Sequence, residues 1–455
     1  DEVQVTIEGY AELSGASFNV LNTPILWSPY LIVPAKTKRS TGLLFPEAGY
    51  SNRLGAFVNL PFYWAIDEEN DMTFYFYGMS SRGYMQGVEY RHYWDLETKG
   101  LWHFDYMHDQ TAVLSDNEAG PLSDDGLSRT NHHRYWWRSK FDSTLKWFGL
   151  PDWDVKIDVD YVSDQNYLRE FDSGFSGFNA SNEAFLDEFR RDLPESDEDR
   201  VSTLLVSREW ERAAVVGRLE YIQGVEYGHG NGNEDDDPSL KRLPEFALYL
   251  FKNRLSFLDG QFESIPLELS GDATWTYFWR STGTIGQRLD VHPEASLPLV
   301  TDYFTLIPSA GWNSTFYFIS EHEETTHPED DGNYFHRGVP DINIDLYSEV
   351  FRVFDLTDGQ ELVASLDTLD QSLWTSIKHS FQPRVQYRYI PNIDQEGNPY
   401  FDEHDRVEEV HGITYSLTNT FSRRQETVVM GQGPDGEPMP IKSTDYQEFL
   451  RVRLE

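Results

Sequence analysis

Cysteine is absent from all 455 residues, so disulfides, thiolate metal ligands and cysteine nucleophiles are excluded from this chain. Basic residues are also scarce, with 37 Lys and Arg against 77 Asp and Glu and a formal net charge of −40. A surface that acidic repels the phosphates of DNA and RNA, so nucleic acid is excluded as a partner. The same acidity suits surfaces that recruit divalent cations.

Long hydrophobic runs are missing as well. The richest apolar stretch, ILWSPYLIVPA at residues 25–35, is far shorter than the ~18–20 residues of a membrane helix and contains two prolines. The first residues, DEVQVTIEGY, show no basic head and apolar middle of a secretion signal. The last residues, YQEFLRVRLE, stop inside an alternating segment. Both ends are therefore interpreted as points within a longer chain.

The dominant pattern is alternation of apolar and polar residues, which is typical of strands with two different faces. In residues 153–161, WDVKIDVDY, every second residue is apolar and the others are Asp or Lys. Residues 101–109, 381–389 and 412–421 alternate in the same way. The pattern predicts an all-β chain of about sixteen antiparallel strands, many longer than the ~5–6 residues usual for a strand.

A single helix is predicted, at residues 182–193 (NEAFLDEFRRDL). Asn182 is a suitable N-cap. Its expected apolar face contains Phe185, Leu186, Phe189 and Leu193. The helix falls within one of the long connections between strands.

The connections between predicted strands alternate in length. The longest ones mostly share one parity and so lie at the same end of the strands: 110–130, 164–197, 225–239, 321–334 and 391–407. Two connections break the rule, because 279–285 is short and 355–373 is long. Short turns at one end and long loops at the other are typical of a bacterial outer-membrane β-barrel. A soluble β-sandwich stays open as an alternative, although its strands are usually shorter.

Motifs for chemistry are weak. HEETTH at residues 322–327 has its histidines five residues apart, whereas helical zinc ligation needs four. The acidic clusters at 195–199, 233–238 and 329–331 lack the spacing of an EF-hand and are expected to be loop tips, with divalent cation capture as a hypothesis. No phosphate loop or nucleophile elbow is present. The prediction is therefore a protein that is not an enzyme, with no cofactor, no catalytic residue and no metal ligand.

Two prolines stand in or beside the first strands of the barrel. Pro46 ends LLFP, and Pro61 lies within GAFVNLPFYWAI. Proline has no amide hydrogen, so a strand that contains it pairs weakly. An ordinary strand-end proline would look the same, but the pair also fits a seam that opens.

Ordered short motifs along nearly the whole chain resemble the lipopolysaccharide-assembly outer-membrane protein family, also called the organic solvent tolerance protein. The matching elements are Arg39, Gly42, Leu44 and Pro46; Pro61 to Trp64; Asp71 and Thr73; Arg82 and Gly83; Glu89 to Arg91; and residues 163–171, 242–245 and 286–298. Many family members join their domains by disulfides, which this stretch cannot form.

The resemblance implies that residues 1–40 end a periplasmic β-jelly roll and that 41–455 form the N-terminal part of a barrel of about twenty-six strands. It further implies lipopolysaccharide transport into the outer leaflet, with lateral release through a gate at Pro46 and Pro61. The implied partners are lipopolysaccharide, a lipoprotein plug, a periplasmic jelly-roll bridge protein and the lipid bilayer. The aromatic segment 60–94 is then three early strands whose aromatic side chains face lipid and its interface, while many of the rest pack against the lumen lining or the plug.

The expected location is the outer membrane of a Gram-negative bacterium. Two other functions are kept as alternatives. One is a porin or TonB-dependent receptor for solute uptake, which would carry a constriction loop or a plug domain. The other is a soluble acidic β-sandwich that acts on carbohydrate.

Overall fold

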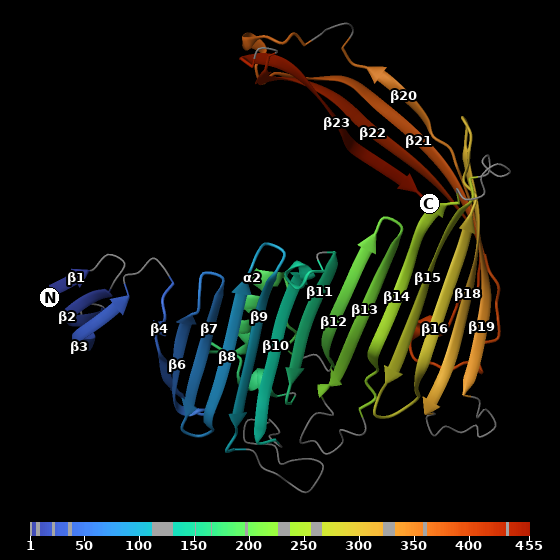
Figure 1. Ribbon diagram of the computed structural model, residues 1–455. Helices are drawn as coiled ribbons and strands as arrows, with labels where there is room; N and C mark the ends of the chain where they lie inside the picture. Colours follow the sequence, from blue (N-terminus) through green and yellow to red (C-terminus); the bar gives the residue numbers. More distant parts are fainter. Residues whose placement is uncertain are drawn as a thin grey trace.

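The computed structural model describes residues 2–5, 10–20, 23–34, 39–111, 131–150, 152–164, 166–195, 199–225, 237–255, 266–321, 333–357, 362–433 and 436–455. The first part is a separate antiparallel sheet in the order β1 (Glu2–Val5), β2 (Tyr10–Val20) and β3 (Thr23–Pro34). It lies apart from the rest of the chain at the N-terminal end (Figure 1). Its assignment to a jelly roll stays a prediction.

A second antiparallel sheet contains all the other strands in sequence order, which is the strand order of a barrel. Its strands are β4 (Gly42–Leu43), β5 (Glu47–Ser51), β6 (Gly55–Ala65), β7 (Asn70–Met79), β8 (Gly83–Tyr93), β9 (Lys99–His108), β10 (His133–Thr144), β11 (Trp153–Val162), β12 (Asp199–Trp210), β13 (Ala213–Gly224), β14 (Lys241–Arg254), β15 (Glu268–Trp279), β16 (Ile285–Ser296), β17 (Leu299–Val300), β18 (Thr305–Glu321), β19 (Tyr334–Tyr347), β20 (Val350–Asp355), β21 (Ser372–Ile390), β22 (Val410–Gln432) and β23 (Pro438–Leu454).

The strand count agrees with the expectation once broken strands are recognised. β4 and β5 both pair with β6, β16 and β17 with β18, and β19 and β20 with β21. Each of these pairs acts as one interrupted strand, so the number of crossings is close to the predicted sixteen. The segment 60–94 forms β6 to β8, as predicted.

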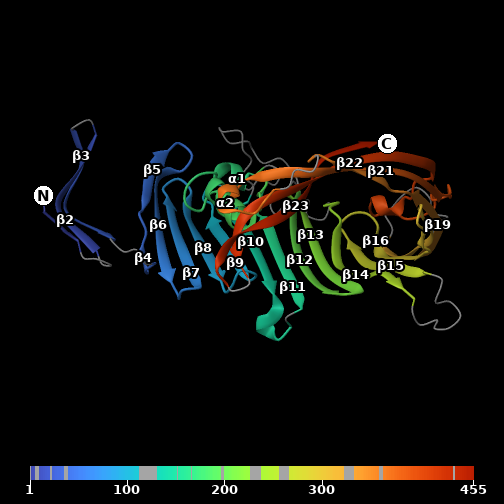
Figure 2. The same cartoon turned by 90° about the horizontal axis from the view of Figure 1, so that it is seen from above.

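The sheet curls on itself. Seen from above, β4 to β16 follow an arc, β19 lies at the turn, and β21 to β23 run back over the concave side (Figure 2). Nearly every residue of β23 is exposed. Two short helices, α1 (Tyr167–Glu170) and α2 (Phe178–Phe189), lie on the concave side of the arc.

The sheet buries polar side chains on one face and exposes large apolar side chains on the other, which is the reverse of a soluble protein. On β9, His103 and Asp105 are 2% and 0% exposed, whereas Phe104 and Tyr106 between them are 40% and 37% exposed. On β14, Phe246, Leu248 and Leu250 are all more than a third exposed and point outward. Burying polar residues while exposing large apolar ones is typical of a barrel surrounded by lipid, and it contradicts the β-sandwich alternative.

Long connections gather at one end of the strands. The described residues 166–195 and 391–409 lie at the lower end of the strands in Figure 1, whereas the tight turns 66–69 and 211–212 lie at the upper end. The exception noted in the sequence also holds, because the long connection between β20 and β21 lies at the upper end. Within the described ranges, no helix reaches the length and apolar character that crossing a membrane requires.

The predicted helix is shifted toward the N-terminus. α2 begins after Gly177, so Asn182 lies inside it and is not its N-cap. The Asn182 side chain instead accepts a hydrogen bond from the amide of Leu193 (2.7 Å) and so holds the segment that follows the helix. Phe185 and Leu193 are buried as expected, but Leu186 is 42% exposed. The prediction missed the first turn because no Ser, Thr, Asp or Asn caps it.

Leu248 near the middle of β14 tests the outward direction of the apolar face. Leu248→Arg is expected to lower the free energy of unfolding in lipid vesicles by about 2–4 kcal/mol, because the charge would meet hydrocarbon. Denaturant titration of the full-length protein in vesicles measures it. Leu248→Met is the matched control and should stay close to the parent protein. Equal stability of the two variants would contradict the orientation.

Candidate functional site: seam and polar interior

The first strand of the second sheet is attached weakly. β4 pairs with β6 through Gly42 and Leu43, and β5 pairs with it from Glu47 to Ser51. Pro46 occupies the gap between these two pieces and is exposed. By contrast, β6 and β7 pair without interruption from Phe57 to Ala65 of β6. The weak side of β6 is therefore the side that faces β4 and β5.

Pro61 adds to the weakness on the same side. The amide of Leu44 donates to the carbonyl oxygen of Pro61 (2.9 Å), so the main-chain polar groups of residue 61 point toward the first strand. In an antiparallel ladder the return bond would run from the amide of residue 61 to the carbonyl of Leu44. Proline has no such amide, so this pair keeps one bond of two.

The connection 163–198 folds inward and fills part of the interior behind β7 to β10. Its aromatic residues Phe178 and Phe185 pack with Met107 and Trp136 in one buried cluster. The rings of Trp136 and Phe178 are stacked with centroids 6.0 Å apart. The cluster closes the concave side at this point with apolar contacts.

Around that cluster, buried arginines join the strands to α1 and α2. Arg82 donates to Asp109 and to Glu170 of α1, the latter at 2.7 Å. Arg134 of β10 donates to Asp164 at 2.8 and 2.9 Å. All of these ion pairs lie in the interior, where Arg82 and Arg134 are each 1% exposed. A buried arginine needs such partners, because an unpaired charge there is very costly.

Arg138 is a third buried arginine on the same face. It forms an ion pair with Asp105 and donates to the hydroxyl of Ser181 (2.7 Å) and to the carbonyl of Ser176 (2.9 Å). Its guanidinium also lies 3.8 Å from the Trp136 ring centroid. A single side chain thus links β9, β10 and α2.

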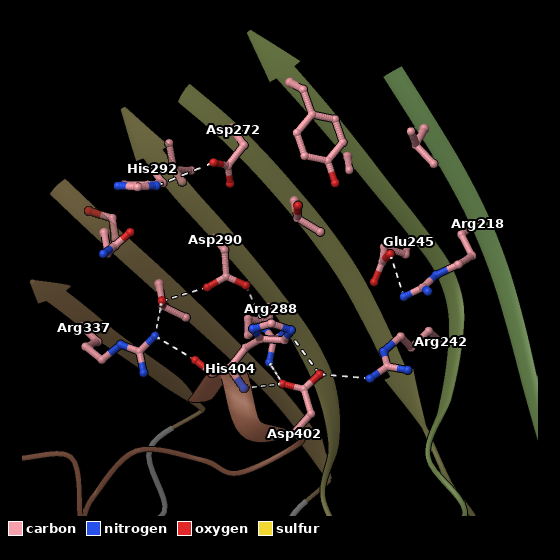
Figure 3. A pocket seen from close by; sticks show the side chains of 18 of the residues that line it. Arg218, Arg242, Glu245, Asp272, Arg288, Asp290, His292, Arg337, Asp402 and His404 are labelled. Carbon is pink, nitrogen blue, oxygen red and sulfur yellow. Dashed lines mark hydrogen bonds and ion pairs between the residues drawn. The ribbon is translucent and has the colours of Figure 1, made fainter. Parts of the chain in front are cut away.

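The connection 391–409 folds onto the concave face of β14 to β19 (Figure 3). Asp402 accepts from Arg288 of β16 (2.6 Å) and Arg242 of β14 (3.1 Å), and Asp405 accepts from Arg288 (2.9 Å). Arg337 of β19 donates to the carbonyl oxygen of Asp405 (2.6 Å). These ionic and polar contacts hold the connection against three separate strands.

An aromatic contact completes this attachment. The ring of Phe401 is stacked on Phe278 of β15 with centroids 4.4 Å apart, and both side chains are buried. Burying Phe401 removes apolar area from water, worth about 1.5–3 kcal/mol. The connection is therefore anchored by charge on one side and by a stacked ring on the other.

The arginines lower the pKa of two carboxyl groups that lie outside the strands. Burial raises the pKa of Asp402, but hydrogen bonds and charge from Arg288 and Arg242 outweigh it, so its pKa lies below the usual value. Burial likewise opposes ionisation of Asp109, and the Arg82 contacts again bring the pKa below its usual value. Both groups are carboxylates at neutral pH.

Between the inward-folded connection and the strands lies a cavity of about 620 Å³. Its wall combines both charges with hydroxyl and amide groups: Arg218, Arg242, Glu245, Tyr249, Asp272, Thr274, Arg288, Asp290, His292, Asn313, Ser314, Thr315, Arg337, Asp402 and His404 are among the lining residues. The arginines and carboxylates mostly neutralise each other, as for Arg218 and Glu245 at 3.0 Å. Such a surface offers hydrogen bonds to a hydrated ligand rather than a net charge.

The sequence motifs for metals find no support in the described part of the chain. HEETTH, the cluster at 329–331, and most of the clusters at 195–199 and 233–238 lie outside the described residues. Asp237 is described, and it accepts from Lys241 (2.8 Å). Across the described ranges, no group of three or more His, Asp or Glu could hold a metal ion.

Sequence reasoning missed the residues that hold the inward-folded connections. Arg242 and Arg288 were noted only as parts of family-like motifs, and Asp402 and Asp405 were not singled out. The sequence did contain a signal for these four residues, because all of them lie among polar residues of alternating or loop segments. Nothing in the alternation shows, however, that a loop turns back into the interior.

Asp405 offers a test of this attachment. Asp405→Ala removes a buried acceptor of Arg288 and is expected to weaken docking of 391–409 by about 3 kcal/mol. Hydrogen exchange of the amides at 399–407 should become faster, while exchange in β15 and β16 stays slow. Glu403→Ala changes an exposed carboxylate of the same turn and should leave exchange as in the parent. Unchanged exchange in Asp405→Ala would refute the ionic anchor.

The lowered pKa of Asp402 gives a pH dependence. A carboxyl whose pKa is lower in the folded than in the unfolded state stabilises the fold fully above the unfolded value of ~3.9 and loses this as pH falls through the folded value. Docking of 391–409 should therefore be unchanged between pH 8 and 5 and weaken only in more acidic solution. Hydrogen exchange corrected for intrinsic pH effects measures it, and loss of docking near pH 6 would be inconsistent with this assignment.

Comparison with known proteins places the chain. The family model described as "LptD: LPS transport system D" matches residues 132–436. The LPS-assembly protein LptD of Methylococcus capsulatus is 22% identical over 93% of this chain and 36% of its own length. That of Pasteurella multocida is 25% identical over 85% of this chain and 41% of its own. That of Shewanella frigidimarina is 31% identical over 36% of this chain and 19% of its own.

The chain spans less than half the length of these curated relatives. Among solved structures, Pseudomonas aeruginosa OccK10 covers 91% of this chain and 96% of its own at a TM-score of 0.24 and 8% identity, which is too low to support an argument. The family match, however, extends over well more than half of the residues, from β10 to β22 and through both inward-folded connections. The chain therefore belongs to the LptD family, LPS transport system D.

Proposed function

We propose that this chain is part of a transporter that delivers lipopolysaccharide to the outer leaflet of the outer membrane. The observation that carries the proposal is the distribution of side chains over the sheet. Large apolar residues such as Phe246 and Leu248 are exposed outward, and polar ones such as His103 and Asp105 are buried inward. Such a wall suits an amphiphile whose acyl chains belong in lipid and whose sugars need hydrogen bonds.

Release is proposed to occur sideways, at the first strand. Its attachment to β6 is interrupted at Pro46 and lacks one hydrogen bond at Pro61. A ladder in hydrocarbon loses several kcal/mol for each unsatisfied polar group, so it parts most easily where bonds are already missing. Pro46 and Pro61 are the residues to which this gate role is assigned.

The location is the outer membrane of a Gram-negative bacterium. The further partners belong to the same proposal: a lipoprotein plug in the lumen and a periplasmic jelly-roll bridge protein that hands over the substrate. Residues 1–40 would belong to the jelly roll that receives it, and 41–455 to the barrel. Transport of this kind involves no covalent step, so neither a catalytic residue nor a cofactor is assigned. Divalent cations bound at acidic loops stay a hypothesis.

The gate is tested by restoring the main-chain hydrogen bonds between the first strand and β6. Pro61→Val supplies an amide opposite Leu44, which should add about 0.5–1.5 kcal/mol to the pairing, and Pro46→Val removes the break in the strand. Both variants, in the full-length protein, are expected to slow the appearance of newly made lipopolysaccharide at the cell surface. Pulse-labelling followed by surface detection measures the rate.

Pro308→Val is the matched control, because Pro308 lies in β18, far along the sheet from β6. It should deliver at the parent rate. Normal delivery in both Pro46→Val and Pro61→Val, at equal protein levels, would argue against a gate at this seam.

A further inference from the structure

A second cavity, of about 1090 Å³, lies on the concave side next to the first strand. Its walls come from β5, from β6 and β7, and from the segment that follows α1. It shares no lining residue with the cavity of Figure 3. Glu47, the residue after Pro46, lies in its wall.

One wall of the cavity is aromatic and fixed in place. Phe57 and Tyr77 are in edge-to-face contact with centroids 5.8 Å apart, and Tyr77 is 7% exposed. The Phe57 ring also covers Gly49, where a Cβ would come within 2.6 Å of the ring. Rigid aromatic faces beside a few polar groups are typical of sites for small organic ligands, including sugar rings.

The same sheet face, in line with Asn59 and Tyr77, holds a buried acceptor that is not satisfied. Oε2 of Glu47 is buried and has no hydrogen-bond partner among the described residues. A carboxylate oxygen can only accept, and leaving it buried without a donor is unfavourable. A ligand that brings hydroxyl groups into the cavity would supply the missing donor.

The charge of the lining selects against anions. Arg82 forms ion pairs with Asp109 and Glu170. Arg53 donates to the carbonyl oxygens of residues 169 and 170 at 3.3 Å. Glu47 and Asp172, which also line the cavity, form no ion pair within the described part of the chain. The lining contains three carboxylates, Glu47, Glu170 and Asp172, and two arginines, Arg53 and Arg82, so its formal charge is −1, which disfavours a phosphate or carboxylate.

We infer that this cavity is a binding subsite for an uncharged, hydroxyl-rich saccharide. The inference rests on the proposed transport function and specifies the part of the glycolipid that the subsite takes: the neutral sugars of the head group, not its phosphorylated sugars. The partly exposed ring of Phe57 provides the flat face, with Tyr77 packed edge-to-face against it, and Glu47 accepts from a sugar hydroxyl. Because Glu47 belongs to β5, the neutral sugars are held directly behind the strand at which release is proposed.

The test uses the full-length protein, purified with its partners in detergent micelles. Two probes are compared by ligand-observed NMR titration: an uncharged oligosaccharide of neutral hexoses and the same oligosaccharide carrying one phosphate. The parent protein is expected to bind the neutral probe more tightly. Glu47→Gln should weaken the neutral probe about fivefold, because a charge-assisted hydrogen bond becomes a neutral one, and should strengthen the phosphorylated probe, because repulsion is removed.

Glu437→Gln, at an exposed turn, is the control and should change neither probe. A merely structural role of Glu47 would shift both probes in the same direction, so the opposite shifts identify direct contact. Tighter binding of the phosphorylated probe to the parent protein, or an unchanged neutral probe in Glu47→Gln, would overturn the inference. So would displacement of the neutral probe by Mg²⁺ alone, which would identify a cation site.

The two proposals fail separately. If the neutral probe does not bind but the proline variants slow surface delivery as expected, the subsite is wrong and transport through the seam stands. If the full-length protein does not support surface delivery at all, the proposed function itself is wrong.

Discussion

The whole structure depends on satisfying main-chain hydrogen bonds where no water can reach them. A strand in hydrocarbon must pair on both sides, and neighbouring strands in a continuous antiparallel sheet provide this pairing. The uninterrupted registers from β6 to β13 meet this requirement, for instance in the pairing of β12 with β13. Each side chain then points either outward to lipid or inward to the lumen.

The inward face creates its own electrostatic problem. Buried arginines such as Arg138 and Arg288 would be prohibitively costly if left alone, and each is matched by carboxylates. Some of these carboxylates come from neighbouring strands, but Glu170, Asp402 and Asp405 come from connections that turn back into the interior. Satisfying the charges and filling the lumen are therefore achieved by the same contacts, and the remaining cavity is lined largely by polar side chains.

The first strand does not pair continuously with its neighbour. Its position connects this incomplete pairing with the proposed release. Pro46 interrupts it, and Pro61 withholds one donor from it, on the side that faces the edge of the sheet. Behind it lies the acidic cavity lined by Glu47, in place of the packed cluster that supports β7 to β10. An interrupted ladder and a strand without a packed cluster behind it thus coincide, and this is the arrangement that the proposed lateral release requires.

Much of the fold could be read from alternation alone, because the period of two directly reports which side chains share a face. Phe104 and Tyr106 were separable from His103 and Asp105 without a structure, and the two prolines could be noted for the same reason. Helix limits were less certain, since α2 begins without a capping side chain at Gly177 and Asn182 serves another purpose. Loop lengths indicated the two ends of the strands, but not the path of any loop.

By itself the sequence determined the strands, their two faces and the acidic balance of the chain, since these follow from local residue order. Only the tertiary structure decided that Asp402 and Asp405 reach Arg242 and Arg288, more than a hundred residues away. It likewise decided that Glu47 and Asp172 line one cavity. The physical reason is that such contacts depend on the curvature of the sheet and on loops folding inward, and neither leaves a periodic trace in the residue order.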